Sequence, residues 1–475
     1  MSRDNFHNNL NSKEVRQLVK QFELMLKNNG NGFFEQGSFQ QIIEFYEEQL
    51  EYQKAFEVVN MALEQHPYSA IFLIKKAQFF YQARQCEDAI QFLDTAEVLA
   101  PNEMEAILLR AEVYSYLGKG KEAIELLEEA LPFGDTDEKI EILLALTEVH
   151  ENNNDEKEAY ETLLRGLDIN PTHESILHKL DFCVEMLGNY EDSIDIHKRI
   201  IDIDPYCYLA WYNLANAYYS LQLYEKAVEA YEFVTVINEK YDLAYRDCGD
   251  AYFEMEQYDK AKEQFLECLT LEKEKDDELY YNIGICDYQL GNYAGAIEYF
   301  ERVIELIPSH SDAYFQIGEC YRELKRWDEA FAFYNKAVKF ALSKDEYLAA
   351  IGELHHDLEN YDMAISSYQE AIETNPKDVN YWIGWAKSFF ALELFEEALQ
   401  IAETAHRDVN KEDNAELLML ISTCLFALGK KKLATAYFIE ALQLDFKSCK
   451  LCFDLLPKLL EDSDILALLE LYHED

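Results

Sequence analysis

The feature that most constrains this chain is a unit of 34 residues that occurs twice in succession between Tyr208 and Lys275. The first copy reads YLAWYNLANAYYSLQLYEKAVEAYEFVTVINEKY and the second DLAYRDCGDAYFEMEQYDKAKEQFLECLTLEKEK. Aromatic and small residues recur at matching places, so that Ala227 corresponds to Ala261. Self-similarity at a period of roughly 20 to 50 residues is typical of stacked-repeat proteins. The repeat therefore outweighs a domain count taken from chain length alone.

The same unit continues in both directions. The small residue at its twentieth position returns after 34 residues in eight of eleven intervals and after 35 or 36 in the others. The residues at position 20 are Ala55, Ala89, Ala123, Ala159, Ser193, Ala227, Ala261, Ala296, Ala330, Ala364, Ala398 and Ala434. The sequence thus predicts about twelve units over residues 36–448, an N-terminal tail and capping helix over 1–35 with a frayed start at 1–11, and C-terminal capping helices over 449–475.

Each unit is expected to form two helices of about 14 residues, roughly 20 Å long. Six of the eight prolines fall at position 32, where proline ends the second helix because it has no N–H to donate. Four glycines, namely Gly118, Gly188, Gly291 and Gly429, fall at position 15, where a left-handed residue commonly ends a helix. The 16 glycines of the whole chain leave little material for β-turns. The expected fold class is therefore all-α.

Several residues of the first copy carry a resemblance to a known family. They are Trp211, Leu214, Ala215, Tyr218, Ala227 and Tyr231. This spacing resembles the tetratricopeptide repeat, a helix-turn-helix unit of 34 residues. The resemblance implies a right-handed α-solenoid (superhelix) of stacked units. It also implies a concave groove lined by the first helix of each unit at positions 2, 5, 9, 12 and 13.

Those positions assign a peptide-binding groove in the three central units. Its residues are Tyr212, Asn216, Tyr219, Arg246, Asp250, Phe253, Tyr281 and Tyr288. Other units add carboxylates around the aromatic centre, namely Glu44, Glu47, Glu112, Glu148, Glu319, Glu323 and Glu353. Tyrosine offers large, rigid contact area at low entropic cost. The alternative for each tyrosine is that it packs against the next unit and contacts no ligand.

One branch of the family grips the C-terminal carboxylate of a peptide with lysine, asparagine and arginine at set positions. Of that set, this sequence shows only fragments such as Asn216. The pattern does not favour an acidic tail as the ligand.

Charge is the second strong property of the sequence. The chain has 92 acidic and 42 basic residues, a net charge of −50. Such a surface repels phosphates and anionic lipid heads and favours basic partners. We therefore expect a protein or peptide partner that is basic or has aromatic or apolar anchors, and no nucleic acid. Solubility of a repeat protein explains the same charge, and the sequence does not distinguish the two causes.

The sequence shows no apolar run of about 18 residues and no signal peptide at its start. We accordingly expect no membrane insertion and a cytoplasmic location. The identity of the partner and the oligomeric state stay open.

Possible catalytic and metal motifs are weak. Cys449 and Cys452 form a lone CxxC without the second ligand pair of a zinc site. His173 and His178 are five residues apart, whereas helical zinc ligands lie four apart on one face. No catalytic residue, metal site or cofactor is predicted.

Two function classes follow from these observations. The favoured one is a non-catalytic scaffold or adaptor that binds a peptide or protein partner in the concave groove. The alternative is an enzyme or enzyme subunit with a helical-repeat body and an unrecognised site. About 60 residues lie outside the repeats, split between two ends, and these are too few for a separate catalytic domain.

Overall fold

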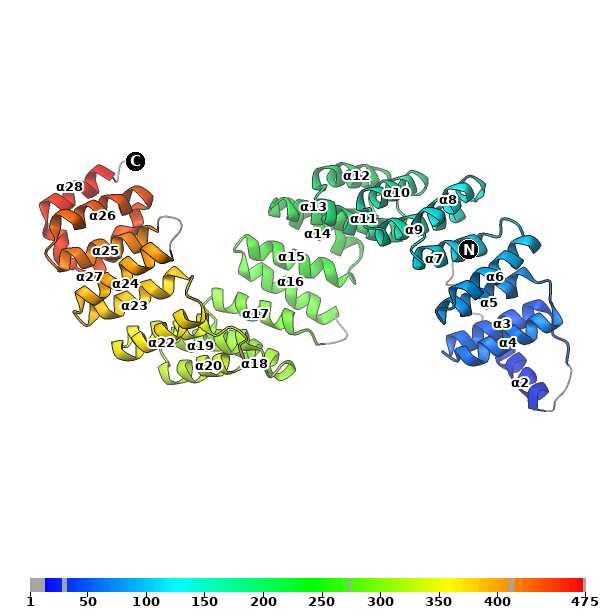
Figure 1. Ribbon diagram of the computed structural model, residues 1–475, viewed down its shortest axis with the longest axis horizontal. Coiled ribbons are helices and arrows are strands. Elements are labelled where there is room, and N and C mark those ends of the chain that lie inside the picture. The colour runs from blue at the N-terminus through cyan, green and yellow to red at the C-terminus, as the bar shows by residue number, and fades with distance from the viewer. Residues whose placement is uncertain (1–12, 28–31, 272–274, 410–413, 473–475) are drawn as a thin grey trace. The chain divides into compact units, whose positions relative to one another are not determined.

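The computed structural model describes residues 13–27, 32–271, 275–409 and 414–472, and their regular structure is entirely helical (Figure 1). The predicted frayed segment 1–11 lies outside the described residues. The chain divides into two compact units, an N-terminal unit of residues 1–239 and a C-terminal unit of residues 240–475.

The N-terminal unit begins with helix α2 (Lys13–Lys27) and continues as helix pairs. The pairs are α3 (Gln36–Glu48) with α4 (Tyr52–Gln65), α5 (Ala70–Gln82) with α6 (Cys86–Leu99), α7 (Met104–Tyr116) with α8 (Gly120–Ala130), α9 (Thr136–Asn152) with α10 (Glu156–Ile169), α11 (Glu174–Leu187) with α12 (Tyr190–Ile203), and α13 (Tyr208–Ser220) with α14 (Tyr224–Ile237). A 3-10 turn, η1 (Leu131–Phe133), follows α8. Each helix packs on its partner and on the next helix of the chain.

The C-terminal unit has the same organisation. Its pairs are α15 (Asp242–Glu254) with α16 (Tyr258–Leu271), α17 (Asp277–Gln289) with α18 (Tyr293–Leu306), α19 (Ser311–Glu323) with α20 (Trp327–Phe340), α21 (Asp345–Asp357) with α22 (Tyr361–Thr374), α23 (Val379–Ala391) with α24 (Phe395–Asp408), and α25 (Ala415–Ala427) with α26 (Lys431–Leu444). The chain continues through η2 (Phe446–Ser448), α27 (Cys449–Leu455), η3 (Pro457–Glu461) and α28 (Ser463–Tyr472). The described residues thus hold twelve helix pairs, and the all-α solenoid prediction is confirmed.

Small residues bring the two helices of each pair into close contact. All eleven alanines at position 20 are 0% exposed, and Ser193 is 1% exposed. At position 8, a Cβ atom on Gly249 would lie 2.6 Å from the Phe265 ring, and one on Gly284 would lie 2.6 Å from the Phe300 ring. Such distances are far inside van der Waals contact, so glycine at position 8 makes room for the aromatic ring at position 24.

The turn between the two helices needs a left-handed residue in every pair. The four glycines predicted at position 15 have φ angles between +69° and +75°. The other eight pairs place a residue with a side chain there, also at positive φ: Leu50, Arg84, Asn154, Gln222, Glu256, Lys325, Glu359 and Glu393. Left-handed backbone costs a residue with a Cβ roughly 1 kcal/mol. Helix packing therefore imposes this geometry even where the sequence lacks glycine.

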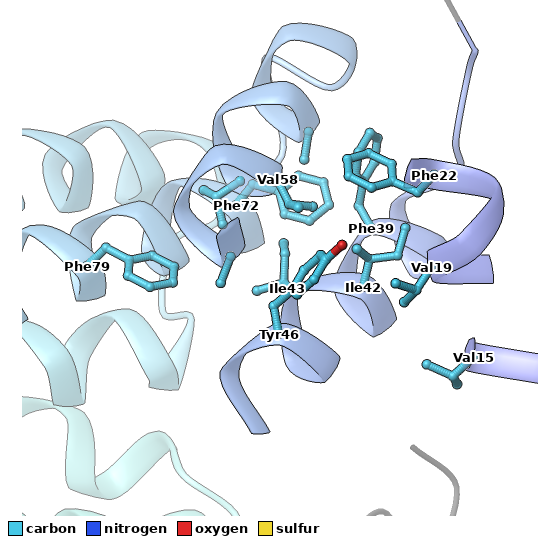
Figure 2. Packing of buried hydrophobic residues seen from close by; sticks show 13 residues of the cluster. Val15, Val19, Phe22, Phe39, Ile42, Ile43, Tyr46, Val58, Phe72 and Phe79 are labelled. Carbon is cyan, nitrogen blue, oxygen red and sulfur yellow. The ribbon is translucent and has the colours of Figure 1, made fainter. Parts of the chain in front are cut away.

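Helix α2 covers the exposed end of the first pair. Figure 2 shows Val15, Val19 and Phe22 directed at the buried side chains of α3. The Phe22 ring meets the Phe39 ring edge-on, with centroids 6.2 Å apart. At the other end of the chain, Ile465 of α28 is fully buried. These contacts support our proposal that residues 1–35 and 449–475 contain caps, because a terminal repeat otherwise leaves an apolar face in water.

Candidate functional site

The C-terminal unit has a groove on the first helices of four successive pairs. Helices α17, α19, α21 and α23, with the turns that precede α21 and α23, enclose about 1450 Å³. Its aromatic lining is Tyr288, Phe315, Phe340, Tyr347 and Tyr381. Its acidic lining is Asp312, Glu319, Asp345, Glu346, Glu353 and Asp378. Most of the lining side chains come from these four first helices, and Phe340 comes from the end of α20.

The groove has one guanidinium among these carboxylates, that of Arg322. Its nitrogen atoms lie 3.7 Å from Glu319, 3.4 Å from Glu353 and 3.6 Å from Asp357. Burial raises the pKa of Glu353, although the charge of Arg322 opposes that shift. Six lining carboxylates facing one lining cation give the groove a negative potential, which attracts cationic ligands.

Asp345 forms the floor of the groove and is 8% exposed. It accepts hydrogen bonds from the Asn375 amide at 3.0 Å and from the Tyr381 hydroxyl at 3.2 Å. Burial alone would raise its pKa, but the hydrogen bonds from Ser343, Asn375 and Tyr381 lower the pKa overall. The carboxylate therefore stays ionised and fixed at the bottom of the groove.

A second hollow of about 1380 Å³ lies in the same unit, near the start of α17. Tyr281 lines it and stacks on the ring of His310, with centroids 5.5 Å apart. Burial raises the pKa of Tyr281 to about 12, so its hydroxyl remains a hydrogen-bond donor at neutral pH. Asp276, Asp277 and Glu278 give this hollow acidic character as well.

Of the five groove residues predicted in this unit, two line the hollows: Tyr288 the first and Tyr281 the second. Arg246 forms ion pairs with Asp276 and, at 3.3 Å, with Glu278. Burial, with the charges of Asp247 and Glu278, raises the pKa of Asp250 to about 7. Phe253 packs edge-on against Tyr258, with ring centroids 5.2 Å apart.

The three residues predicted in the N-terminal unit take part in its packing. Tyr212 is 9% exposed, and its ring lies 5.9 Å from that of Tyr231. Asn216 donates to Asp181 at 2.9 Å and accepts from the Tyr231 hydroxyl at 2.7 Å. Tyr219 meets Tyr224 edge-on, with centroids 5.4 Å apart. The ring of Tyr212 thus packs within its own repeat, against the second helix of the same pair.

Sequence reasoning missed several groove residues, among them Phe315, Arg322, Tyr347 and Tyr381. Phe315 and Arg322 occupy positions 5 and 12 of the ninth unit, so the same rule would have found them had it been extended past the eighth. Tyr347 and Tyr381 occupy position 3, which that rule does not include. The Tyr381 hydroxyl donates a hydrogen bond to Asp345 at the start of α21, and the Tyr347 hydroxyl donates one to Asp312 of α19.

In the part of the chain that the structure describes, no helix has both the length and the apolar character required to cross a bilayer.

Models of the family described as tetratricopeptide repeat match residues 208–240, 248–275, 277–343, 345–378 and 415–448. A model described as anaphase-promoting complex, cyclosome, subunit 3 matches residues 48–130. Among curated proteins, the chain is similar to tetratricopeptide repeat-containing protein trd-1 of Caenorhabditis elegans, with 24% identity over 149 residues. That match covers 31% of this chain and only 19% of the worm protein.

Similar solved structures include YrrB, described as a TPR protein with an unusual peptide-binding site, at 23% identity and a TM-score of 0.33. The match covers 39% of this chain and 95% of YrrB. MamA is 24% identical with a TM-score of 0.34, covering 36% and 94%. PilF of Pseudomonas aeruginosa is 20% identical with a TM-score of 0.36, covering 44% and 94%.

Proposed function

Because the chain belongs to the tetratricopeptide-repeat family, whose members are generally protein-interaction scaffolds, we propose that it is a non-catalytic scaffold that binds a protein or peptide segment in the groove of its C-terminal unit. The observation that carries this proposal is the composition of the groove on α17, α19, α21 and α23. Five aromatic rings and six carboxylates line this groove, which has a volume of about 1450 Å³. Aromatic anchors in concave surfaces supply most of the binding energy of protein interfaces.

The ligand that fits this groove is a basic segment with aromatic or apolar anchors. Its Lys or Arg side chains are attracted by carboxylates such as Glu346 and Glu353. Its apolar side chains gain contact area against rings such as Tyr288 and Phe315. The proposed binding surface also includes four residues of the same unit that the sequence predicts. They are Arg246, Asp250 and Phe253 on α15, and Tyr281 near the start of α17.

The groove chemistry favours a scaffold over the alternative of an enzyme subunit. Glu319 accepts a hydrogen bond from Tyr334, and Asp312 accepts one from Tyr347. Glu319 also pairs with Arg322. Carboxylates held in place by such partners are suited to the recognition of a positively charged segment.

The test is binding of two labelled peptides to the full chain by surface plasmon resonance. One peptide alternates lysine with tryptophan and the other alternates glutamate with tryptophan. We expect the lysine peptide to bind more tightly and its affinity to fall with added salt. Tyr288→Leu should raise the off-rate, because that ring forms part of the apolar wall. Glu346→Gln with Glu353→Gln should mainly lower the on-rate.

Glu301→Gln with Glu305→Gln is the matched control, since it removes two exposed charges from the neighbouring helix α18. It should leave both rates close to those of the unaltered chain. Equal binding of the acidic peptide would refute the proposed ligand chemistry. Unchanged kinetics for Tyr288→Leu, with helical circular dichroism intact, would refute the groove.

A further inference from the structure

The N-terminal unit contains an acidic hollow of its own. Helices α5, α7 and α9, the first helices of three successive pairs, enclose about 550 Å³. Its lining includes Tyr81, Glu112, Ser115, Tyr116, Glu148 and Asn152. We call it the α7 pocket.

The α7 pocket repeats the arrangement of the C-terminal groove, residue position by residue position. The second, third and fourth 34-residue repeats supply the α7 pocket, and the eighth, ninth and tenth repeats supply the corresponding part of the groove. The corresponding residues are Tyr81 and Tyr288, Glu112 and Glu319, Ser115 and Arg322, and Glu148 and Glu353. The aromatic residue and both glutamates are kept, whereas serine stands in the α7 pocket where the C-terminal groove has arginine.

The C-terminal groove shows what this arrangement can hold. The Arg322 guanidinium lies between two position-9 carboxylates of adjacent units, 3.7 Å from Glu319 and 3.4 Å from Glu353. A planar guanidinium with several N–H donors suits two carboxylates that approach from different helices. The chain thus contains one copy of the arrangement with its guanidinium in place.

In the α7 pocket the chain does not supply that cation. The Ser115 hydroxyl accepts a hydrogen bond from the Asn152 amide at 3.1 Å. Among the contacts of the described residues, no cation pairs with Glu112. Glu148 lies 3.9 Å from the Lys179 ammonium, which forms its shorter pair, 2.9 Å, with Glu151. Burial raises the pKa of Glu112, and the negative charge of Glu148 raises it further.

The walls of the α7 pocket also suit a guanidinium. The rings of Tyr81 and Tyr116 meet edge-on, with centroids 6.0 Å apart. Arg84 already stacks on Tyr116, its guanidinium carbon 4.9 Å from the ring centroid. Tyr81 offers a second ring beside the carboxylate pair. Guanidinium groups stack on aromatic faces and are more weakly hydrated than ammonium groups, so such a site favours arginine over lysine.

We propose that the α7 pocket binds an arginine side chain of a partner protein, with its guanidinium between Glu112 and Glu148 at the place that Arg322 occupies in the C-terminal unit. This pocket belongs to the N-terminal unit alone and is independent of what the C-terminal groove binds.

The test uses the full chain and two peptides, Ac-Gly-Ser-Arg-Ser-Gly-amide and the same peptide with citrulline, which has the shape of arginine but no charge. Saturation-transfer difference NMR reports binding through the side-chain methylene protons. We expect the arginine peptide to bind about tenfold more tightly than the citrulline peptide, as for the loss of a charge-assisted hydrogen-bonded pair. Ser115→Arg should abolish this preference, because it supplies the guanidinium from the chain itself.

Glu112→Gln with Glu148→Gln is the second variant, nearly equal in size to the native residues, and it should also abolish the preference. Its charge-matched control, Glu122→Gln with Glu125→Gln, removes two exposed carboxylates of α8 and should preserve it. The proposal is overturned if citrulline binds as well as arginine, or if the control loses as much affinity as the pocket variant. It is also overturned if folded Ser115→Arg or the double glutamine variant retains the preference. If Ser115→Arg fails to fold, Ser115→Lys is tested in its place.

Discussion

The Tyr231 hydroxyl donates a 2.7 Å hydrogen bond to the side-chain oxygen of Asn216. The amide nitrogen of the same asparagine donates to Asp181 at 2.9 Å. Tyr231 is 2% exposed, so this network lies inside the N-terminal unit. It explains why the fifth helix pair tolerates an aspartate at a position that is small in most other units, because the carboxylate gains a partner from the next pair.

The first prediction is that Asn216 stabilises α11 and α13 together. Asn216→Ala removes both hydrogen bonds and should lower local stability by about 1–3 kcal/mol, since buried polar groups lose their partners. Tyr231→Phe removes only one of the bonds and should cost about 1 kcal/mol. Hydrogen exchange of the α11 and α13 amides measures both effects. Equal protection in the native chain and in Asn216→Ala would contradict this role.

The second prediction is that the N-terminal unit loses folding stability at low pH because it contains a buried histidine. His197 is 0% exposed; its Nδ1 lies 2.7 Å from the Ser193 carbonyl oxygen, and its Nε2 lies 3.2 Å from the Asn213 amide nitrogen. A neutral ring that donates from Nδ1 and accepts at Nε2 satisfies both contacts. Burial lowers the pKa of His197 from its ordinary 6.5 to about 4.

The direction in which folding stability changes with pH follows from proton binding by His197. Between pH 6.5 and 4 the unfolded chain binds the His197 proton and the folded chain does not, so this contribution to stability is present above 6.5 and lost as the pH falls through 4. The loss is on the order of 3 kcal/mol. Thermal unfolding at pH 7 and 4.5 of the native chain and of His197→Gln isolates it from carboxylate titration. A native chain and variant with the same pH dependence would contradict the assignment.

The third prediction concerns the left-handed turns. Glu256 has φ +56°, and glycine adopts that angle without steric cost. Glu256→Gly should therefore raise stability by about 1 kcal/mol. The same replacement at Glu263, an exposed residue in the interior of α16, should lower it by about 1 kcal/mol. Urea unfolding of the two variants compares them directly, and effects of the same sign would show that the turn geometry is not strained.

The fourth prediction concerns Arg322. Arg322→Ser leaves Glu319, Glu353 and Asp357 without their shared cation and should lower the stability of the C-terminal unit by about 1 kcal/mol. It should also create there an arginine site like the one proposed for the α7 pocket. The arginine peptide has no aromatic or apolar anchor for the C-terminal groove, so its stoichiometry by titration calorimetry should rise from one in the native chain to two in the variant.

Arg326→Ser is the control for that experiment. Arg326 is 53% exposed and pairs with Glu329 within the first turn of α20, so its loss should change neither stability nor stoichiometry measurably. A stoichiometry that stays the same in Arg322→Ser would contradict the equivalence of the two pockets.

The sequence alone predicts the helix pairs, because their determinants are local and repeated. Alanine at position 20 and the small residues at position 8 fix how the two helices of one unit meet, and both are visible as a period of 34 residues. In six of the repeats, proline at position 32 marks where the second helix ends, as with Pro205 after α12. Nearest-neighbour packing then builds the array unit by unit, so no long-range contact has to be predicted.

The groove is harder to predict from the sequence than the helix pairs, because the role of a side chain depends also on contacts with neighbouring repeats. Asn216 has a ligand-facing position by register, but Asp181 and Tyr231 from neighbouring helices engage both of its polar atoms. Tyr381 lines the groove, where its hydroxyl donates a hydrogen bond to Asp345, 36 residues earlier. The period of the sequence therefore determined the helices and their pairing. Contacts between neighbouring repeats, which tertiary packing alone establishes, decided which groove residues stay available to a ligand.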